Sequence, residues 1–384
     1  MAKTNATLIW NIAELLRGPF QPNQYGDVVL PFTILRRLDC ILEPTKEQVI
    51  AAYKQAQSQK IDPAVVLKSK FKLPFFNTSR WTFAKLVSDP EGVADNLNDY
   101  INRFSPNVRD VFDGFKMPDL IADLHKSGRL YLIVKEFAAV DLHPDVVSGT
   151  DMGYIFEELI RKFAESNNAA AGDHFTPREV IKLMVNVLFH SDDDALAKPG
   201  VVRTIYDPAA GTGGMLSTAY DHLVAMNHSA RPVLYGQEIN PRSYAMCKSD
   251  MIIKGQDVDN IYFGDTLTDD GFAGKHFDYL LSNPPFGVEW KSQQKKVTDE
   301  HEQRGHAGRF GPGLPRVSDG SLLFLLHLIS KMEPVKNGQG GSRLAMVLNG
   351  SPLFTGGAGS GESNIRQWII ENDLLDAIIA LPTD

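Results

Sequence analysis

The spacing of hydrophobic and polar residues changes near residue 150. Before it, apolar positions recur at helical intervals in short amphipathic segments that proline, glycine or aspartate separates. The segments predicted to be helical are residues 10–16, 28–42 with an interruption at Pro31, 47–57, 93–103 and 118–126. No period-two alternation persists here and no repeat is visible. We predict an all-α N-terminal domain over residues 1–148, and a helical scaffold without chemistry is its simplest interpretation.

From residue 149 onward, short apolar runs alternate with amphipathic helices. The predicted strands are residues 201–206, 232–236, 260–263, 277–282, 344–348 and 375–381. The predicted helices are residues 154–166, one beginning at Thr176, one ending near 224, and residues 242–254, 321–332 and 362–371. Such alternation is typical of an α/β fold with a Rossmann-like, doubly wound parallel sheet, whose ligands bind at the carboxyl ends of the strands. We assign this domain to residues 149–384.

Composition narrows the class of protein. The 384 residues are 43% hydrophobic and 22% charged, which is an ordinary globular composition. No apolar run approaches the roughly 20 residues that span a bilayer, and the N-terminus is polar where a signal peptide would be apolar. We therefore expect a cytoplasmic protein without a membrane partner. Cys40 and Cys247 form neither a CxxC pair nor a His-rich cluster, so we expect two core thiols and no metal site.

Charge is distributed unevenly along the chain. Residues 1–150 carry a net charge of +1 and the remainder carries −9. Affinity for nucleic acid rests largely on cationic side chains that neutralise phosphates. If DNA is the substrate, we expect another subunit to supply most of the basic surface.

The first motif that indicates a catalytic function is Asn283-Pro284-Pro285-Phe286, which follows the apolar run 277–282. Two prolines end the strand in a rigid extended turn. The Asn283 side-chain oxygen and the Pro284 carbonyl can accept from a planar amine, Pro285 stiffens the turn, and Phe286 offers a stacking face. For this motif alone, an ordinary strand-ending turn with a buried Phe remains an equal interpretation.

Other polar or glycine-rich positions also follow predicted strands. Gly211, Gly213 and Gly214 allow a tight turn at a helix start, where backbone N–H groups can approach a ligand. Glu238 can accept from ribose hydroxyls, and Asp265 can accept from an adenine amino group. The glycine spacing disfavours a nicotinamide site, and no P-loop motif is present. S-adenosylmethionine fits best, although each element alone is more often merely structural.

Residues 173–179 form another candidate segment. Thr176 suits a helix N-cap, Pro177 the first helical position and Glu179 the first turn. Helix capping alone would explain these residue types.

Taken together, the motifs make the chain resemble the modification (M) subunit of type I restriction-modification systems, an amino-methyltransferase. The matching segments occur in the family's order and are residues 10–17, 29–38, 174–178, 207–214, Glu238, 264–266 and 283–286. The resemblance implies a methyltransferase fold and S-adenosylmethionine as cofactor. It implies cofactor contacts from Asp173, His174, Phe175, Thr176, Pro177, Arg178, Asp207, Ala209, Gly211, Thr212, Gly213, Gly214, Glu238 on the ribose and Asp265 near the adenine. Asn283, Pro284, Pro285 and Phe286 would form the catalytic turn.

The activity implied by the resemblance is methylation of adenine N6 in DNA on a flipped base. The expected partners are double-stranded DNA, a specificity (S) subunit that reads the sequence, a restriction (R) subunit that cleaves, and a second M subunit. Three alternatives remain open: a catalytically silent assembly subunit, N4-cytosine methylation, and methylation of protein glutamine. Phe286 and the segment 174–177 argue against the last of these.

Two further expectations concern single segments. The insertion 288–317 carries a net charge of +2, and we predict a solvated mobile loop, with a flap over DNA as the alternative. In the family, the last predicted strand is followed by an aromatic-Asn-Thr-Gly segment, a seventh strand and a helical tail, whereas this sequence stops at Asp384. We therefore expect a shortened form of a longer protein, which binds cofactor with little or no methylation.

Overall fold

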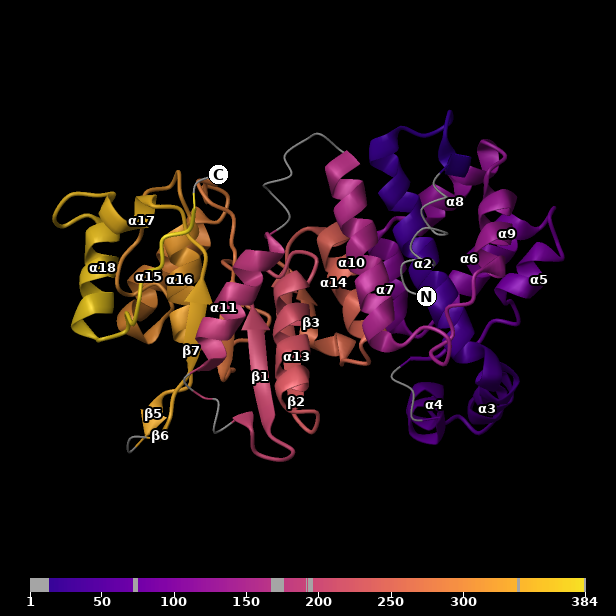
Figure 1. Ribbon diagram of the computed structural model, residues 1–384, viewed down its shortest axis with the longest axis horizontal. Helices are drawn as coiled ribbons and strands as arrows, with labels where there is room; N and C mark the ends of the chain where they lie inside the picture. Colours follow the sequence, from indigo (N-terminus) through magenta and orange to yellow (C-terminus); the bar gives the residue numbers. More distant parts are fainter. Residues whose placement is uncertain are drawn as a thin grey trace. The chain divides into compact units, whose positions relative to one another are not determined.

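The computed structural model describes residues 14–71, 75–166, 176–190, 192, 196–336 and 339–382, which form two compact units (Figure 1). The first contains the described residues up to position 166 together with Gly211–Gly214 and Asn240–Ile261. The second contains the described residues of Thr176–Ala210, Met215–Ile239 and those from Tyr262 onward. The chain therefore passes between the units more than once.

Helices build the first unit. Between residues 14 and 166 the regular elements described are all helical, which confirms the prediction for this part. Most of the helix predicted over residues 10–16 lies outside the described residues, and its end forms a 3₁₀ turn, Glu14–Leu16. The α-helices are α2 (Tyr25–Leu42), α3 (Lys46–Ser58), α4 (Pro63–Phe71), α5 (Phe83–Val87), α6 (Val93–Asn102), α7 (Pro106–Gly114), α8 (Met117–Lys126), α9 (Leu130–Ala139), α10 (Gly149–Ser166) and α14 (Pro241–Ile253).

The predicted interruption at Pro31 is wrong, because α2 continues through it. Proline inside a helix costs about 3 kcal/mol through a lost hydrogen bond and a steric clash. Val29, Leu30, Phe32 and Ile34 around it are buried, and each such side chain contributes roughly 1.5–3 kcal/mol. Burial therefore outweighs the local penalty.

Helices α7 and α14 pack closely within the first unit. A Cβ at Gly114 would lie 2.8 Å from the Pro241 carbonyl oxygen, a separation that only glycine allows. Beside it, Lys248 Nζ lies 2.5 Å from Asp110 Oδ2, and the Tyr244 hydroxyl donates to the same oxygen at 3.0 Å. The Lys248 side chain is 4% exposed and that of Asp110 is 41% exposed, so solvent screens the ion pair in part, and together with the Tyr244 hydrogen bond it links α7 to α14.

A five-stranded sheet forms the centre of the α/β part of the chain. Its order is β3-β2-β1-β4-β7, and the pairs β1–β2, β1–β4 and β4–β7 are parallel. The strands are β1 (Val202–Asp207), β2 (Arg231–Glu238), β3 (Ile261–Phe263), β4 (Tyr279–Ser282) and β7 (Arg343–Met346). All four residues of β4 are buried, as expected for a central parallel strand. The predicted doubly wound α/β sheet is confirmed.

Helices cover both faces of this sheet in the second unit. Phe189 of α11 (Arg178–His190) packs edge-on against Tyr279 of β4 at 4.6 Å and stacks on His222 of α13 (Gly214–Met226) at 5.6 Å. Both helices cross in front of the sheet in Figure 1. On the opposite side, the hydroxyl of Tyr206 of β1 lies 2.9 Å from His327 Nε2 of α16 (Ser321–Ser330). The carboxyl ends of the strands therefore emerge between two helical layers.

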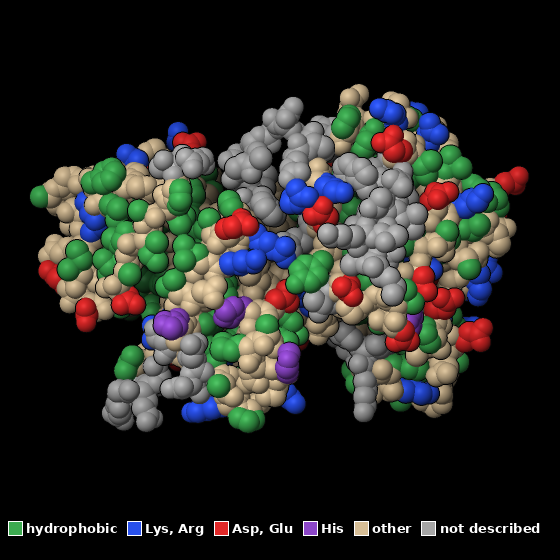
Figure 2. Space-filling view, viewed as in Figure 1, with side chains coloured by type: hydrophobic (Ala, Val, Ile, Leu, Met, Phe, Trp, Pro, Cys, Tyr) green, Lys and Arg blue, Asp and Glu red, His purple; other side chains and the backbone are tan. Residues whose placement is uncertain are grey.

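The prediction of a strand over residues 375–381 is wrong. After α17 (Ser351–Phe354) and α18 (Gly361–Glu371), residues 374–382 adopt no regular structure, and Ile378 is 61% exposed. Apolar residues give strand propensity, but a strand also needs a neighbouring backbone, and no described strand pairs with this segment. Phe354 and Ile370 are 75% and 66% exposed, and hydrophobic side chains gather over this part of the second unit in Figure 2.

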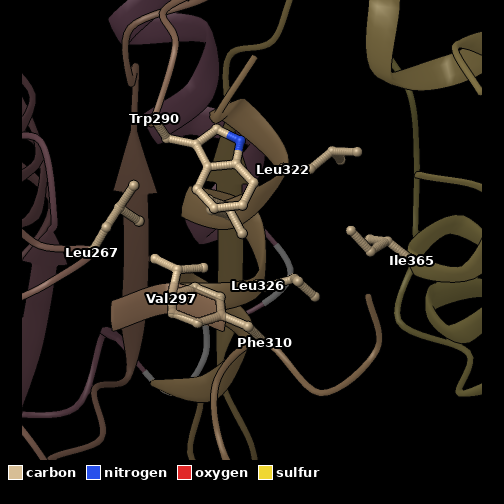
Figure 3. Packing of buried hydrophobic residues seen from close by; sticks show 8 residues of the cluster. Leu267, Trp290, Val297, Phe310, Leu322, Leu326 and Ile365 are labelled. Atoms are coloured by element: carbon tan, nitrogen blue, oxygen red, sulfur yellow. The ribbon is translucent and has the colours of Figure 1, made fainter. Parts of the chain in front are cut away.

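The insertion 288–317 is packed, so the prediction of a solvated mobile loop is wrong. It contains α15 (Gln294–Arg304), and a short hairpin of β5 (Val335–Lys336) and β6 (Gln339–Gly340) follows α16. Trp290, Val297 and Phe310 enter a hydrophobic cluster with Leu267 and residues of α16 and α18 (Figure 3). These apolar residues are too widely spaced among charges to produce a periodic signal, yet a buried tryptophan alone removes 150–250 Å² from water.

Both cysteines are free and buried, which confirms the expectation of core thiols. Among the described helices, none combines the length and apolar character that crossing a bilayer requires. Within the same residues, no three His, Cys, Asp or Glu side chains are grouped to hold a metal ion.

Candidate functional site

The turn after β4 presents an unpaired acceptor. Asn283 Nδ2 donates to Thr176 Oγ1 at 2.9 Å, which fixes the side-chain amide. Asn283 Oδ1 is buried and has no hydrogen-bond partner in the described structure. Leaving a buried polar atom unsatisfied costs about 1–3 kcal/mol, so Oδ1 is available to accept a hydrogen bond from a bound molecule. Pro284 is buried, whereas Pro285 and Phe286 are exposed, Phe286 by 37%.

Asp207 supports this turn from the neighbouring strand. It ends β1, is 1% exposed, and its Oδ1 accepts from Ser282 Oγ at 2.8 Å and from the Ala209 backbone at 3.0 Å. Burial raises the pKa of Asp207 from an ordinary value of 3.8 to about 7, although these two hydrogen bonds oppose the shift. Asp207 thus connects the residue before Asn283 with the loop after β1.

The raised pKa of Asp207 gives stability a pH dependence. Between pH 3.8 and 7 the folded state keeps a proton that the unfolded state releases, so stability falls as pH rises and levels off above 7. From pH 5 to 8, the free energy of unfolding of the wild type should fall by about 3 kcal/mol because of Asp207. Asp207→Asn should not show this fall, because asparagine resembles the protonated acid at every pH. Urea denaturation of both proteins across this range measures the difference. Asp376→Asn, at an exposed position, is the control. Parallel curves for the wild type and Asp207→Asn would contradict the assignment.

Backbone hydrogen bonds bring the loops after β1, β2 and β3 together. Ala210 N donates to the Gln237 carbonyl at 3.0 Å, and Gly264 N donates to the Glu238 carbonyl at 3.0 Å. The Thr266 hydroxyl donates to the Pro208 carbonyl at 2.5 Å. The predicted residues Ala209, Glu238 and Asp265 therefore lie on connected loops at one edge of the sheet. Glu238 is 8% exposed and Asp265 is half-buried.

Asp265 is held on both carboxylate oxygens. Oδ1 accepts from the Leu267 backbone at 2.9 Å, and Oδ2 accepts from Gln293 Nε2 at 2.8 Å. Each carboxylate oxygen has a second lone pair, so the group retains capacity for another donor.

The glycine turn belongs to the first unit. Gly211 and Gly213 have φ values of +55° and +86°, which favour glycine. A Cβ at Gly213 would lie 3.0 Å from Cys247 Sγ and 3.3 Å from Cys247 Cα. Thr212 lies within the same turn, and Gly214 begins α13. The backbone of this turn therefore lies close to Cys247 of α14, and its approach to a ligand stays a prediction.

The segment before α11 is described in part. Asp173, His174 and Phe175 lie outside the described residues. Pro177 directly precedes α11, and its carbonyl accepts from the Ile181 backbone at 3.1 Å. Thr176 and Arg178 flank Pro177, so Thr176 stands at the helix start and also holds Asn283.

Sequence reasoning missed several residues that shape the site. Ser282, Gln293 and Arg309 each hydrogen-bond to a candidate residue or to its loop. For Ser282 the available signal was its position beside Asn283. Gln293 and Arg309 lie in the insertion and gave no motif.

A family model described as N-6 DNA Methylase matches residues 147–384. The chain belongs to the N-6 DNA methylase family. A second model, described as the HsdM N-terminal domain, matches residues 6–137. The resemblance derived from the motifs is thus confirmed.

Similar proteins include type I methylase subunits. The chain is 29% identical over 394 aligned residues to the type I restriction enzyme MjaIX methylase subunit of Methanocaldococcus jannaschii, covering 97% of this chain and 65% of that one. It is 29% identical over 234 residues to the HindI methylase subunit of Haemophilus influenzae, covering 60% and 47%. The chain therefore spans less than two thirds of the first relative and about half of the second.

A solved structure shares the fold. It is the methyltransferase subunit of a type I restriction-modification system from Streptococcus thermophilus, with a TM-score of 0.69 and 23% identity. The match covers 97% of this chain and 79% of the other. Similarity at this level of identity confirms the fold class.

Proposed function

We propose that this chain is the modification subunit of a type I restriction-modification complex, which methylates adenine N6 in DNA with S-adenosylmethionine. The observation that carries the proposal is the buried, unpaired Oδ1 of Asn283, whose amide Thr176 fixes at 2.9 Å. An exocyclic amine supplies the donor that this acceptor lacks.

The residues of the turn would prepare the amine for reaction. The lone pair of a nucleobase amine is delocalised into the ring, so the amine is a weak nucleophile. Acceptance of its hydrogens by Asn283 Oδ1 and the Pro284 carbonyl would aim the lone pair and make positioning the main catalytic effect. Phe286, 37% exposed, would replace part of the stacking lost when the base leaves the duplex.

S-adenosylmethionine supplies an electrophilic methyl group on a sulfonium. Transfer of this methyl group would leave the C–S electron pair on sulfur, and the amine held by Asn283 and Pro284 would release a proton to solvent. We assign cofactor binding to Glu238 on the ribose and Asp265 near the adenine, with Thr176–Arg178, Ala209 and Gly211–Gly214 lining the ligand. Asp207, 1% exposed, would act by holding Ala209 and Ser282 in place. Asp173, His174 and Phe175 remain part of the proposed cofactor set.

We infer the partners from the kind of protein that the relatives are and from the net charge of this chain. Residues 151–384 carry a net charge of −9, so we assign most phosphate contacts and the reading of sequence to a specificity subunit. A second modification subunit and a restriction subunit complete the proposed complex on double-stranded DNA.

Two measurements test the proposal. Calorimetric titration of this chain with S-adenosylmethionine should show saturable binding at one site. Mapping of modified bases in DNA from cells that carry the complete operon should find N6-methyladenine at one recurring sequence, which disappears when the gene is deleted.

Each measurement can overturn a different part of the proposed function. Absence of cofactor binding would contradict the methyltransferase assignment and favour a silent assembly subunit. N4-methylcytosine at the recurring sequence would keep the chemistry and contradict adenine as the target.

A further inference from the structure

The insertion after the catalytic turn holds the Asp265 loop through a chain of side chains. Ser292 Oγ donates to Gln293 Oε1 at 2.6 Å, which orients that amide. Gln293 Nε2 then donates to Asp265 Oδ2 at 2.8 Å, while Leu267 N holds the other carboxylate oxygen at 2.9 Å. Both the position and the rotation of the Asp265 carboxylate are therefore fixed.

Arg309 fixes the backbone of the same loop. Its guanidinium donates to the Thr266 carbonyl at 2.7 Å and to the Leu267 carbonyl at 3.0 Å. Glu300 binds the guanidinium at 2.7 Å, and both side chains are only 14% exposed. Burial raises the pKa of Glu300, but hydrogen bonds and charge from Arg309 outweigh it and hold the pKa below its usual value. Glu300 and Arg309 therefore remain ionised while Arg309 holds the backbone of the Asp265 loop.

His327 lies beside Arg309 and is a neutral imidazole. Burial lowers its pKa, and the nearby charges of Arg309 and Lys331 lower it further. Arg309 lies 3.2 Å from His327 Nδ1 and can only donate, so Nδ1 accepts. The remaining Nε2–H then faces the Tyr206 hydroxyl at 2.9 Å. The loop carrying Asp265 is thereby connected to the central strand β1.

The two ends of the insertion are joined to each other. Trp290 N donates to the Val317 carbonyl at 2.9 Å, and Gly320 N donates to the Val288 carbonyl at 3.0 Å. The Trp290 ring, 3% exposed, donates to the Arg316 carbonyl at 2.9 Å and packs with Leu267 (Figure 3). The insertion therefore forms a closed loop whose two ends are joined and which packs against the loop that carries Asp265.

We propose that Gln293 is a positioning residue that orients Asp265 to accept the exocyclic amine of the cofactor's adenine. The inference rests on the proposed function and adds a role for the insertion. A half-buried carboxylate on a loop can rotate, and the Gln293 amide holds one oxygen while leaving it a lone pair. The insertion starts at Val288, two residues after Phe286, so the segment that holds the Asp265 loop is close in sequence to the turn proposed to hold the target base.

The test separates orientation of Asp265 from general loosening. Wild type and Gln293→Leu are titrated with S-adenosylhomocysteine and with S-inosylhomocysteine, in which an oxo group replaces the amine. The variant should bind S-adenosylhomocysteine roughly tenfold more weakly, the size of one hydrogen bond to a charged group. Its affinity for the inosine ligand should stay within about twofold of wild type. Gln294→Leu, an identical change at the next, exposed position, should leave both affinities unchanged.

Each other outcome overturns the inference. Equal losses for both ligands would mean that Gln293 stabilises the site as a whole, and no loss for either would mean that Asp265 orients without it. Ser292→Ala, which frees the Gln293 amide, should weaken only S-adenosylhomocysteine binding, and unchanged binding would also count against the chain of contacts. Failure of the wild type to bind either ligand would overturn the proposed function, and with it this inference.

Discussion

Replacing Asn283 by alanine should lower methyl transfer by a factor of about 10²–10³, the usual effect of removing one preorganised polar group from a reacting centre. The substitution removes the buried Oδ1 acceptor and the hydrogen bond that Asn283 donates to Thr176, whereas the hydrogen bonds described for the loops after β1, β2 and β3 do not involve Asn283. Affinity for S-adenosylmethionine should therefore be nearly unchanged. Methyl incorporation into target DNA by the proposed complete complex measures the first quantity, and calorimetry on this chain measures the second.

Two further variants sharpen this test. Asn283→Asp keeps an acceptor, and the Thr176 hydroxyl can donate to it, so this variant should be more active than Asn283→Ala. Asn364→Ala, the same change at an exposed position of α18, should have wild-type activity. Turnover by Asn283→Ala of at least a third of the wild-type value would refute the role assigned to this side chain.

Gly213→Val should produce the opposite pattern, with cofactor affinity reduced by a factor of ten or more. Gly213 has a φ of +86°, where a β-branched residue is strained by about 1–3 kcal/mol. Its Cβ would also lie 3.0 Å from Cys247 Sγ, so the turn must move. Calorimetric titration with S-adenosylmethionine measures the loss.

Gly274 offers a matched control for this change. Its φ is +73°, but a Cβ there meets no atom within 4 Å. Gly274→Val therefore adds similar backbone strain without a close neighbour, and it should keep cofactor affinity. Wild-type affinity in Gly213→Val would show that the glycine turn does not contact the ligand.

The fold was largely predictable because its strands are short apolar runs that end at a polar or glycine residue. The run 277–282 illustrates this: residues 279–282 form β4 and all four are buried. Two local rules failed. Pro31 stays within α2 because burial on both sides outweighs the cost of proline, and residues 375–381 lack the paired backbone that propensity alone cannot supply.

The candidate site was predictable only where motifs are contiguous. Asn283 and Thr176 were both singled out, yet their contact spans 107 positions and has no signature in the sequence. The same holds for Gln293 and Asp265, 28 positions apart, and for Arg309 and the Thr266 carbonyl, 43 apart. The contacts of Gln293 and Arg309 are set by how the insertion packs, which depends on a few scattered apolar side chains.

The contact between α7 and α14 bears on how such proteins can be recombined. Asp110 lies 134 positions before Tyr244 and 138 before Lys248. A chimera with a crossover anywhere between them inherits Asp110 and Gly114 from one parent and the facing side of α14 from the other. A parent with a larger residue at position 114 would meet the Pro241 carbonyl. Chimeras of two relatives should therefore fold mainly where both parents share this pairing. Where they do not, the helical N-terminus and α14 must come from the same parent.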